Sequence, residues 1–252
     1  MHYKNIEYAA FKAWPAKEQH GSDAVVMRFA DGYTKRANSA TVLSASNTED
    51  ASLRRSCEQF YLRRNLPCII RITSRSQAHQ LDVHLAGCGY EYRDRSLILD
   101  RVLSGEQQPS ASLQESQQGS GLVIVQPRQW LQEFCQLSGS DYQEHLAHLA
   151  ILERIDQQMI LAQWQVQGRV VACGVGVISN GYFGVFDLLT DPASRNCGYA
   201  TKLLSAMSNW AIEHDATHSY LQVVAANTAA INLYQKLGYR QSYEYWYRIK
   251  EN

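Results

Sequence analysis

The chain has 252 residues, which is long enough for one large or two small domains with buried cores. Apolar residues make up 45% and charged residues 19%, a composition that excludes a disordered, collagen-like or coiled-coil protein. The 24 Lys and Arg residues balance the 24 Asp and Glu residues. The overall charge therefore gives no electrostatic reason to expect nucleic acid or an anionic membrane as the main partner.

The N-terminal sequence and the cysteines indicate a cytoplasmic protein. No apolar run reaches the roughly 18 residues that a membrane span needs, and residues 1–8 are polar and mixed. The cysteines lack Cys-x-x-Cys pairs and zinc-like spacing, so we expect reduced thiols and no metal. They are Cys57, Cys68, Cys88, Cys135, Cys173 and Cys197.

The first half mixes helical and strand patterns. Helical spacing covers residues 5–17, 49–65 and 77–86. Strand patterns cover residues 24–30, 67–73 and 90–102. Asp31-Gly32 predicts a hairpin turn with its second strand starting at Tyr33.

A stretch rich in Ser, Gln, Gly and Glu separates the two halves. It runs over residues 104–121 and contains Leu113 as its one sizeable apolar residue. This composition is typical of a linker. We therefore expect two domains, residues 1–103 and 122–252, joined by the linker 104–121.

The second half predicts an antiparallel meander followed by alternating helices and strands. The expected strands are residues 122–125, 159–167, 169–179, 182–190, 218–225 and 239–249. The expected helices are residues 127–137, 141–155, 192–214 and 227–237. Together the halves give a mixed α/β (α+β) fold with a mostly antiparallel central sheet flanked by helices.

The segment after the strand 182–190 has the features of an anion site. Gly198 and Ala200 are small enough to let backbone N–H groups at a helix N-terminus approach a ligand. Arg195 would add a positive charge and Thr201 a hydroxyl group. A close helix–strand contact is the alternative explanation, because this motif by itself is weakly specific.

A second motif follows about 30 residues later, from Asn227 through Ala230, Leu233, Tyr234 and Lys236 to Gly238-Tyr239. With Arg195, Gly198 and Ala200, it resembles the signature of the GCN5-related N-acetyltransferase (GNAT) superfamily, Arg/Gln-x-x-Gly-x-Gly/Ala followed by Asn-x-x-Ala-x-x-Leu-Tyr-x-Lys-x-Gly-Phe/Tyr. The resemblance covers about residues 122–250. Asn196 departs from the glycine usual after the arginine, although Asn tolerates left-handed backbone conformations.

The resemblance implies that acetyl-CoA binds as the acyl donor. Its pyrophosphate would lie on the loop from Arg195 to Thr201, and its pantetheine along the end of the strand 182–190. The implied cofactor-binding residues are Leu188, Leu189, Thr190, Arg195, Asn196, Cys197, Gly198, Tyr199, Ala200, Thr201, Asn227, Tyr234 and Lys236. Asn227 could also cap its helix.

The resemblance also implies two catalytic roles. Tyr234 matches the family position whose hydroxyl protonates the departing thiolate, although half-buried packing would also explain a tyrosine there. Asp187 is the candidate general base, and strand alternation could point it away from the cleft. Glu244 is a weaker candidate. His145 and His148 are spaced three residues apart on a helix, and we expect them on a solvated face.

The first half carries a weaker resemblance to the same fold. Helix, Gly, Tyr and strand recur over residues 81–100 in the order found over 233–249, without an Arg-x-x-Gly-x-Gly/Ala loop. This indicates a degenerate copy, as in bacterial tandem members. Lys35, Arg36 and Asn38 could present polar groups to a substrate or form a solvated hairpin end.

The sequence therefore predicts an acetyl-CoA-dependent N-acetyltransferase acting on a primary amine, in a small molecule or a peptide. Direct attack on the thioester in a ternary complex requires no metal and no covalent enzyme intermediate. Two alternatives remain, because a fold does not fix a function. One is a non-catalytic acyl-CoA-binding module, and the other is an enzyme that uses another acyl donor. The sequence does not indicate the oligomeric state.

Overall fold

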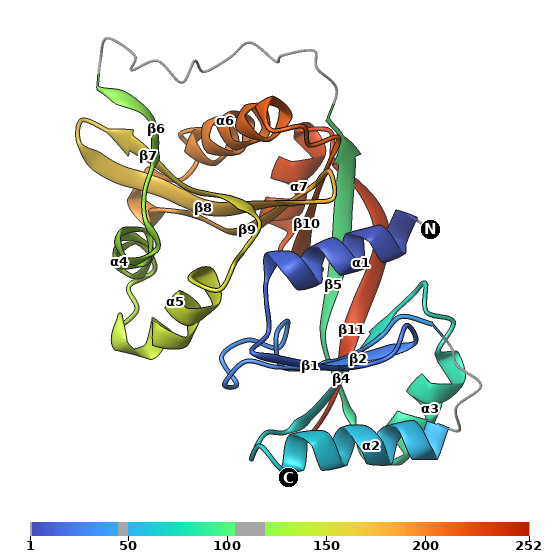
Figure 1. Cartoon of the computed structure of the whole chain (residues 1–252). Coiled ribbons are helices and arrows are strands. Elements are labelled where there is room, and N and C mark those ends of the chain that lie inside the picture. The colour runs from blue at the N-terminus through green and yellow to red at the C-terminus, as the bar shows by residue number, and fades with distance from the viewer. Residues whose placement is uncertain (1, 45–49, 104–118, 252) are drawn as a thin grey trace.

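The computed structural model describes residues 2–44, 50–103 and 119–251. Figure 1 shows an upper and a lower lobe joined by two long strands, β5 and β11. The helices are α1 (His2–Ala13), α2 (Asp50–Leu62), α3 (His79–Gly87), α4 (Pro127–Ser138), α5 (Leu146–Leu152), α6 (Tyr199–Glu213) and α7 (Thr228–Lys236), with 3-10 turns at Gln143–His145 and Pro192–Ser194.

The strands form one continuous sheet of eleven, in the order β1-β2-β3-β4-β11-β5-β10-β9-β8-β7-β6. In the first half they are β1 (Glu18–Gly21), β2 (Val25–Phe29), β3 (Ala40–Val42), β4 (Cys68–Thr73) and β5 (Glu91–Val102). In the second half they are β6 (Ser120–Ile124), β7 (Gln158–Val166), β8 (Arg169–Ser179), β9 (Tyr182–Thr190), β10 (His218–Val224) and β11 (Arg240–Lys250).

The two halves exchange their last strands. β5, which ends the first half, pairs antiparallel with β10 of the second half. β11, which ends the second half, pairs antiparallel with β4 of the first half. The parallel pairs β3–β4 and β9–β10 occupy equivalent positions on either side of this exchange. This arrangement supports the predicted repeat, and each half completes the sheet of the other.

Helices cover both faces of the sheet. α1, α4 and α5 pack over one face of the upper lobe, around Trp14, Trp130 and Phe186. α6 and α7 cover the opposite face, around Phe183, Leu204 and Tyr234. α2 and α3 pack on β3 and β4 in the lower lobe. Since α1 contacts β8 and β9, the first half also contributes to the core beside the second half's central strands.

Most predicted elements are confirmed to within a few residues, and two predictions are wrong. The second hairpin strand begins at Ala40 because residues 31–39 form turns. The helix predicted over 192–214 begins at Tyr199, since Asn196 and Gly198 have φ values of 62° and 78°. The predicted linker lies outside the described residues up to position 118, and β6 begins at Ser120.

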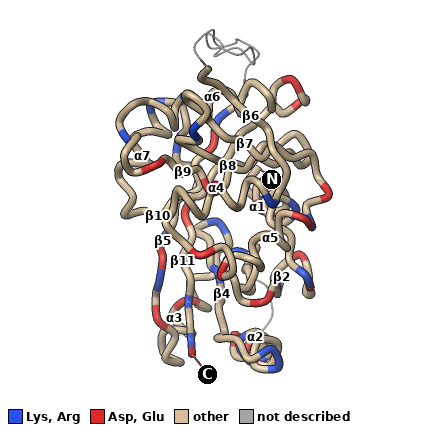
Figure 2. Tube along the Cα trace, turned by 90° about the vertical axis from the view of Figure 1, so that its left-hand side faces the viewer, with Lys and Arg blue, Asp and Glu red and all other residues tan. Residues whose placement is uncertain are grey.

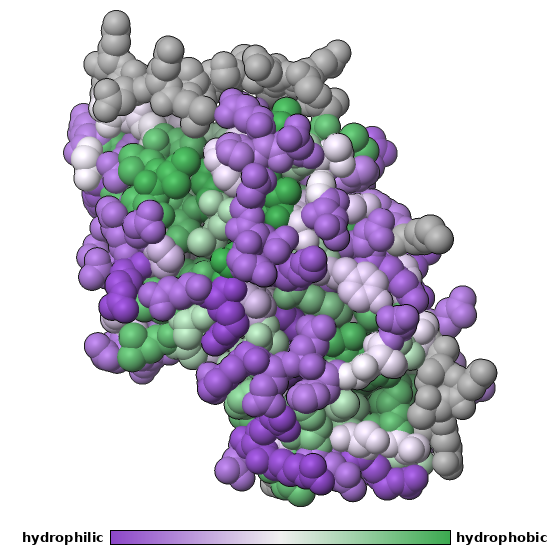
Figure 3. All heavy atoms as spheres, viewed as in Figure 1, coloured by the Kyte–Doolittle hydropathy of each residue, from purple (hydrophilic) through white to green (hydrophobic). Residues whose placement is uncertain are grey.

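Charged and apolar residues of the described ranges are mixed in the views of Figures 2 and 3. Basic and acidic residues are interspersed along the trace (Figure 2). Apolar patches on the face shown in Figure 3 are separated by hydrophilic residues. Among the helices of the described ranges, none is long and apolar enough to cross a membrane.

Candidate active site

Two parallel strands separate in the upper lobe. β9 and β10 pair from Tyr182 to Val185 and from His218 to Leu221. Beyond this point β9 continues along β8 to Thr190, whereas β10 continues along β5. The two strands have no further pairing over the residues described, so backbone groups of 186–190 face an opening. Backbone amides at such a separation can bind the amides of an extended ligand.

A β-bulge lies where the strands separate. Val175 pairs with Phe186 and Cys173 with Leu189, so Asp187 and Leu188 both lie opposite Gly174. Asp187 has a φ of 47°, in the left-handed region. The extra residue shifts the alternation of side chains along β9. Asp187 therefore lies on the same face of the sheet as Phe186, where α1 and α5 pack.

Asp187 is held by partners from both halves of the chain. Its Oδ2 lies 3.1 Å from Nε2 of His148, and its Oδ1 lies 3.5 Å from the Arg36 guanidinium. Burial raises the pKa of the Asp187 carboxyl, but the hydrogen bond from His148 and the charge of Arg36 outweigh burial and hold this pKa below its ordinary value. Asp187 is therefore an anion at neutral pH.

Buried polar side chains hold the loop that carries Arg36. Asn38 Oδ1 accepts hydrogen bonds from the backbone N–H groups of Ala30 (2.7 Å) and Gly32 (3.0 Å). The Arg28 guanidinium donates to the Arg36 carbonyl at 2.7 Å. Asn38 is buried and holds the turn, so its position does not fit contact with a substrate.

A cavity of about 510 Å³ lies between this loop and the ends of three strands. Arg36 lies in its wall and also contacts Asp187, so the cavity adjoins the bulge. Lys35 pairs with Asp94 across the wall at 2.9 Å. The lining residues come from both halves: Gly32, Tyr33, Thr34, Lys35, Arg36, Asp94, Ser96, Gln222, Val223, Val224, Tyr245 and Tyr247.

The loop between β9 and α6 presents an uncapped helix N-terminus. Asp191 anchors the loop by accepting hydrogen bonds from the Ala193 N–H (3.3 Å) and the Ser194 hydroxyl (3.1 Å). No side chain caps α6, and a Cβ on Gly198 would meet nothing within 4 Å. Arg195, Asn196, Cys197 and Gly198 are exposed, and Tyr199, Ala200 and Thr201 are half-buried. Free N–H groups and the helix dipole suit this end to an anion.

These features agree with comparisons to known proteins. The sequence model of the family described as "Probable histone acetyltransferase Rv0428c C-terminal" matches residues 2–248. The chain belongs to this family. It is an acetyltransferase of the GNAT superfamily. The match spans both halves, so the first half is part of the family's unit rather than an unrelated attachment.

Individual relatives of this GNAT protein share its length and fold. The protein named "Uncharacterized N-acetyltransferase YobR" of Bacillus subtilis is 28% identical over 251 residues, covering 98% of each chain. A GCN5-related N-acetyltransferase from Kribbella flavida has a TM-score of 0.71 at 14% identity, covering 98% of this chain and 95% of that one. A tandem GNAT protein from the clavulanic acid biosynthesis pathway has a TM-score of 0.65 at 10% identity, covering 97% and 87%.

The second GNAT motif lies on α7, beside the strand separation. Tyr234 packs in the cluster that includes Leu188, and burial raises its pKa to about 12. Its hydroxyl makes no hydrogen bond within the described part of the chain. Asn227 caps α7 by accepting a hydrogen bond from the Ala230 N–H at 3.1 Å. Lys236 is exposed in the last turn.

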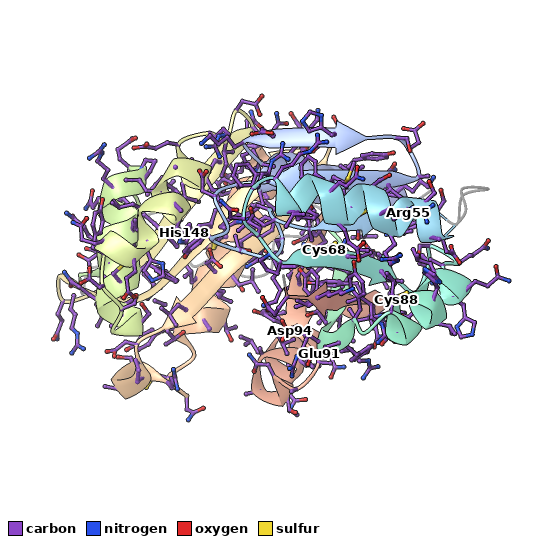
Figure 4. All side chains as sticks on the ribbon, turned by 90° about the horizontal axis from the view of Figure 1, so that it is seen from below. Arg55, Cys68, Cys88, Glu91, Asp94 and His148 are labelled. Carbon is purple, nitrogen blue, oxygen red and sulfur yellow. The ribbon has the colours of Figure 1, made fainter. Side chains whose placement is uncertain are left out.

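The expectation of a solvated face for the helix around His148 is wrong. His148 is 1% exposed because Trp130 and Phe134 pack against its ring, with centroids 5.6 Å and 5.5 Å away. Figure 4 places it on the inner side of α5, opposite the strand that carries Asp94. The helical spacing alone could not reveal this, since the aromatic neighbours come from α4 and α1. Tyr33 was missed for the same reason.

The weaker candidate for the general base lies outside this site. Glu244 on β11 pairs with Arg95 of β5 at 2.6 Å, in a partly exposed position, and is engaged there. No group of three or more metal-ligating side chains occurs within residues 2–44, 50–103 and 119–251.

Proposed function

We propose that this protein transfers an acetyl group from acetyl-CoA to a primary amine by direct attack in a ternary complex. The observation that carries this proposal is the separation of β9 from β10, which leads to the exposed, uncapped N-terminus of α6. Pantetheine amides would pair with backbone groups of 188–190. The pyrophosphate would accept hydrogen bonds from N–H groups of 198–201, with Arg195 as a counter-charge.

The cavity beside the bulge is the proposed acceptor site. It opens between the first-half loop and the ends of β5, β10 and β11, next to Asp187. Residues of both halves would therefore position the amine. We expect proximity of the two substrates to be the main contribution to the acceleration of acetyl transfer. The acceptor panel should contain alkyl amines and amino sugars, and also lysine peptides because the matching family is described as a probable histone acetyltransferase.

Tyr234 is the proposed general acid. A thiolate leaving group needs a proton, and a phenol of pKa about 12 stays protonated throughout the usual assay range. Tyr234 would give its proton to the sulfur and regain one from the nitrogen that becomes the amide. The step is balanced and leaves Tyr234 neutral.

Replacing Arg195 with Glu should weaken acetyl-CoA binding about 10- to 150-fold, on the order of 1.5 to 3 kcal/mol for a reversed charge-assisted contact. The measurement is thermal unfolding with acetyl-CoA. At a ligand concentration of about 100 times Kd, wild type should gain about 2.7 kcal/mol, or roughly 5 to 11 °C. Arg63→Glu makes the same charge change on an exposed residue after α2 and should keep the full shift. Equal shifts in all three proteins would refute the assigned loop.

Replacing Tyr234 with Phe should lower kcat about 100-fold and leave the acetyl-CoA thermal shift unchanged, because only the acidic hydroxyl is lost. Tyr239→Phe is the matched control. Tyr239 lies against Tyr234, with ring centroids 6.1 Å apart, and its hydroxyl bonds to Ser219 at 2.6 Å. The control should lose stability and retain kcat. Full turnover in Tyr234→Phe would refute the acid role.

The same assays distinguish acetyl transfer from the two alternative functions. A non-catalytic acyl-CoA-binding module would show the acetyl-CoA shift without thiol release for any amine. An enzyme using another acyl donor would show a larger thermal shift with that donor than with acetyl-CoA. The residues at the bulge favour catalysis, since a binding module has no use for a half-buried, charged Asp187 beside a cavity.

A further inference from the structure

A line of four polar side chains leads from the bulge toward the surface. The Tyr33 hydroxyl lies 2.6 Å from Nδ1 of His145 and 3.0 Å from Nδ1 of His148. The other nitrogen of His148 lies 3.1 Å from Asp187. Asp187 is half-buried, His148 is buried and His145 is half-exposed, so the line runs from the bulge through the interior toward solvent. Tyr33 comes from the loop after β2 in the first half, and the other three come from the 3-10 turn Gln143–His145, α5 and β9 in the second half.

Donor and acceptor rules assign the protons along this line. The Asp187 carboxylate can only accept, so the adjacent Nε2 of His148 carries a proton. Nδ1 of neutral His148 is then an acceptor, and the Tyr33 hydroxyl donates to it. The Tyr33 oxygen accepts in turn from Nδ1–H of His145. In this arrangement each contact along the line has one donor and one acceptor.

Charged and polar groups from several elements surround His148. Asp187 from β9 and the hydroxyl of Tyr33 contact the imidazole directly. Arg36 neutralises part of the Asp187 charge from the first-half loop. Nearby titratable groups include His145 of the 3-10 turn Gln143–His145, Cys135 of α4 and Cys173 of β8, and burial raises the pKa of both thiols.

The proposed reaction requires an exit for one proton. An ammonium group and acetyl-CoA give an amide, a thiol and one free proton. Two protons leave the nitrogen: one reaches the sulfur through Tyr234, and the other must leave the site. Asp187 is a weak base because its pKa lies below its ordinary value, and burial with the charge of Asp187 raises the pKa of Tyr33 far above its ordinary value. Neither residue can keep this proton.

We propose that Tyr33, His148, Asp187 and His145 form a proton relay for the acceptor amine, an inference that rests on the proposed acetyl transfer. Tyr33, in the cavity wall, takes a proton from the ammonium as it passes its own to Nδ1 of His148. The resulting imidazolium is paired with the Asp187 carboxylate. Once the amide has left, Tyr33 releases its own proton to water in the cavity as it recovers the other from His148, and the Nδ1–H of His145 holds the Tyr33 oxygen in place throughout.

Tyr33 is therefore a catalytic residue, and His148, Asp187 and His145 act through it. This gives the first half a role in the reaction beyond completing the sheet of the second half. The first half supplies Tyr33 and Arg36, and without them the His148–Asp187 pair would have no link to the cavity.

The test is the pH profile of kcat/KM for Tyr33→Phe, measured by thiol release with an amine that wild type accepts. With an acceptor amine of pKa about 8 to 9, we expect a loss of about 10- to 100-fold at pH 7. The variant must use amine already deprotonated in solution, so its rate should rise tenfold per pH unit and approach wild type near the pKa of the amine. Tyr92→Phe, an exposed change on β5, should match wild type at every pH. A uniform loss with an unchanged pH profile would overturn the relay.

A second measurement does not depend on turnover. Nitrogen-15 NMR of labelled histidine should show His148 protonated on Nε2 and not on Nδ1, and Tyr33→Phe should shift the Nδ1 resonances of both His148 and His145. A proton on Nδ1 of His148 would overturn the relay whatever the activity. Absence of thiol release by wild type with every amine would instead refute the acetyl transfer itself.

Discussion

The second half expressed alone, as residues 119–252, is expected to fail to fold, whereas the same segment co-expressed with residues 1–103 should assemble and bind acetyl-CoA. The reason is the strand exchange at the centre of the sheet. β5 of the first half lies between β10 and β11. Without β5 these two strands have no common neighbour. Both flank α7 in the chain, and α7 carries the second motif.

The missing contacts are extensive. β5 pairs with β10 from Val102 to Ser96 and with β11 from Asp100 to Glu91. Leu97 and Leu99 are buried in the cluster under α6 and α7, and Trp14 is buried against Phe186 on the other face. Their removal would expose apolar surface on both faces of the sheet, together with unpaired strand edges.

The control is a full chain with a protease site placed within residues 104–118. Cleavage there should leave the two fragments associated in size-exclusion chromatography, with an acetyl-CoA thermal shift equal to that of the intact chain. A monomeric, cooperatively unfolding 119–252 fragment that binds acetyl-CoA would contradict the strand exchange as a requirement for folding.

The features that the sequence predicted correctly depend on short-range rules. Asn227 caps its helix because its side chain reaches the N–H of Ala230 three residues later. Asn196 adopts the left-handed conformation that its residue type tolerates. The meander of β7, β8 and β9 follows from alternating patterns joined by turns at Gln167-Gly168 and Asn180-Gly181.

The features that the sequence did not predict depend on partners far along the chain. The alternation of side chains along β5 and β11 would be the same in either half of the sheet. No periodic pattern in the sequence therefore indicates the strand exchange. Asp187 points toward His148 because the bulge opposite Gly174 changes the phase of β9. Side chains from three other segments of the chain bury His148. The sequence pattern of its own helix does not indicate this burial.

Replacing Glu7 with Gln should lower the free energy of unfolding by about 3 to 5 kcal/mol, because it leaves a buried guanidinium without its counter-ion. Glu7 of α1 is 1% exposed. Its carboxylate accepts hydrogen bonds from Arg71 of β4, at 3.0 Å to Oε1, and from the hydroxyl of Tyr243 of β11 at 2.7 Å. The Arg71 guanidinium also lies 3.8 Å from the ring centroid of Tyr245.

The measurement is thermal unfolding, where 3 to 5 kcal/mol corresponds to a fall in Tm of about 6 to 20 °C for a chain of this size. Glu91→Gln is the control, since this carboxylate pairs with Arg93 on the surface and should leave Tm nearly unchanged. In the Glu7→Gln background, Arg71→Met should recover part of the loss, because it removes the uncompensated charge. Equal Tm values for Glu7→Gln and Glu91→Gln would contradict this account.

The same variant should also affect the site, because α1 ends beside it. Trp14, directly after α1, stacks on Phe186 at 5.2 Å, and the Arg36 guanidinium lies 5.2 Å from the Trp14 ring centroid. Loosening α1 would therefore disturb the side chain that holds Asp187. We expect Glu7→Gln to lose acceptor turnover at temperatures below its own Tm, while acetyl-CoA, bound by second-half residues, still raises that Tm. The buried Glu7–Arg71 ion pair would then connect the position of α1 to the geometry of the acceptor cavity.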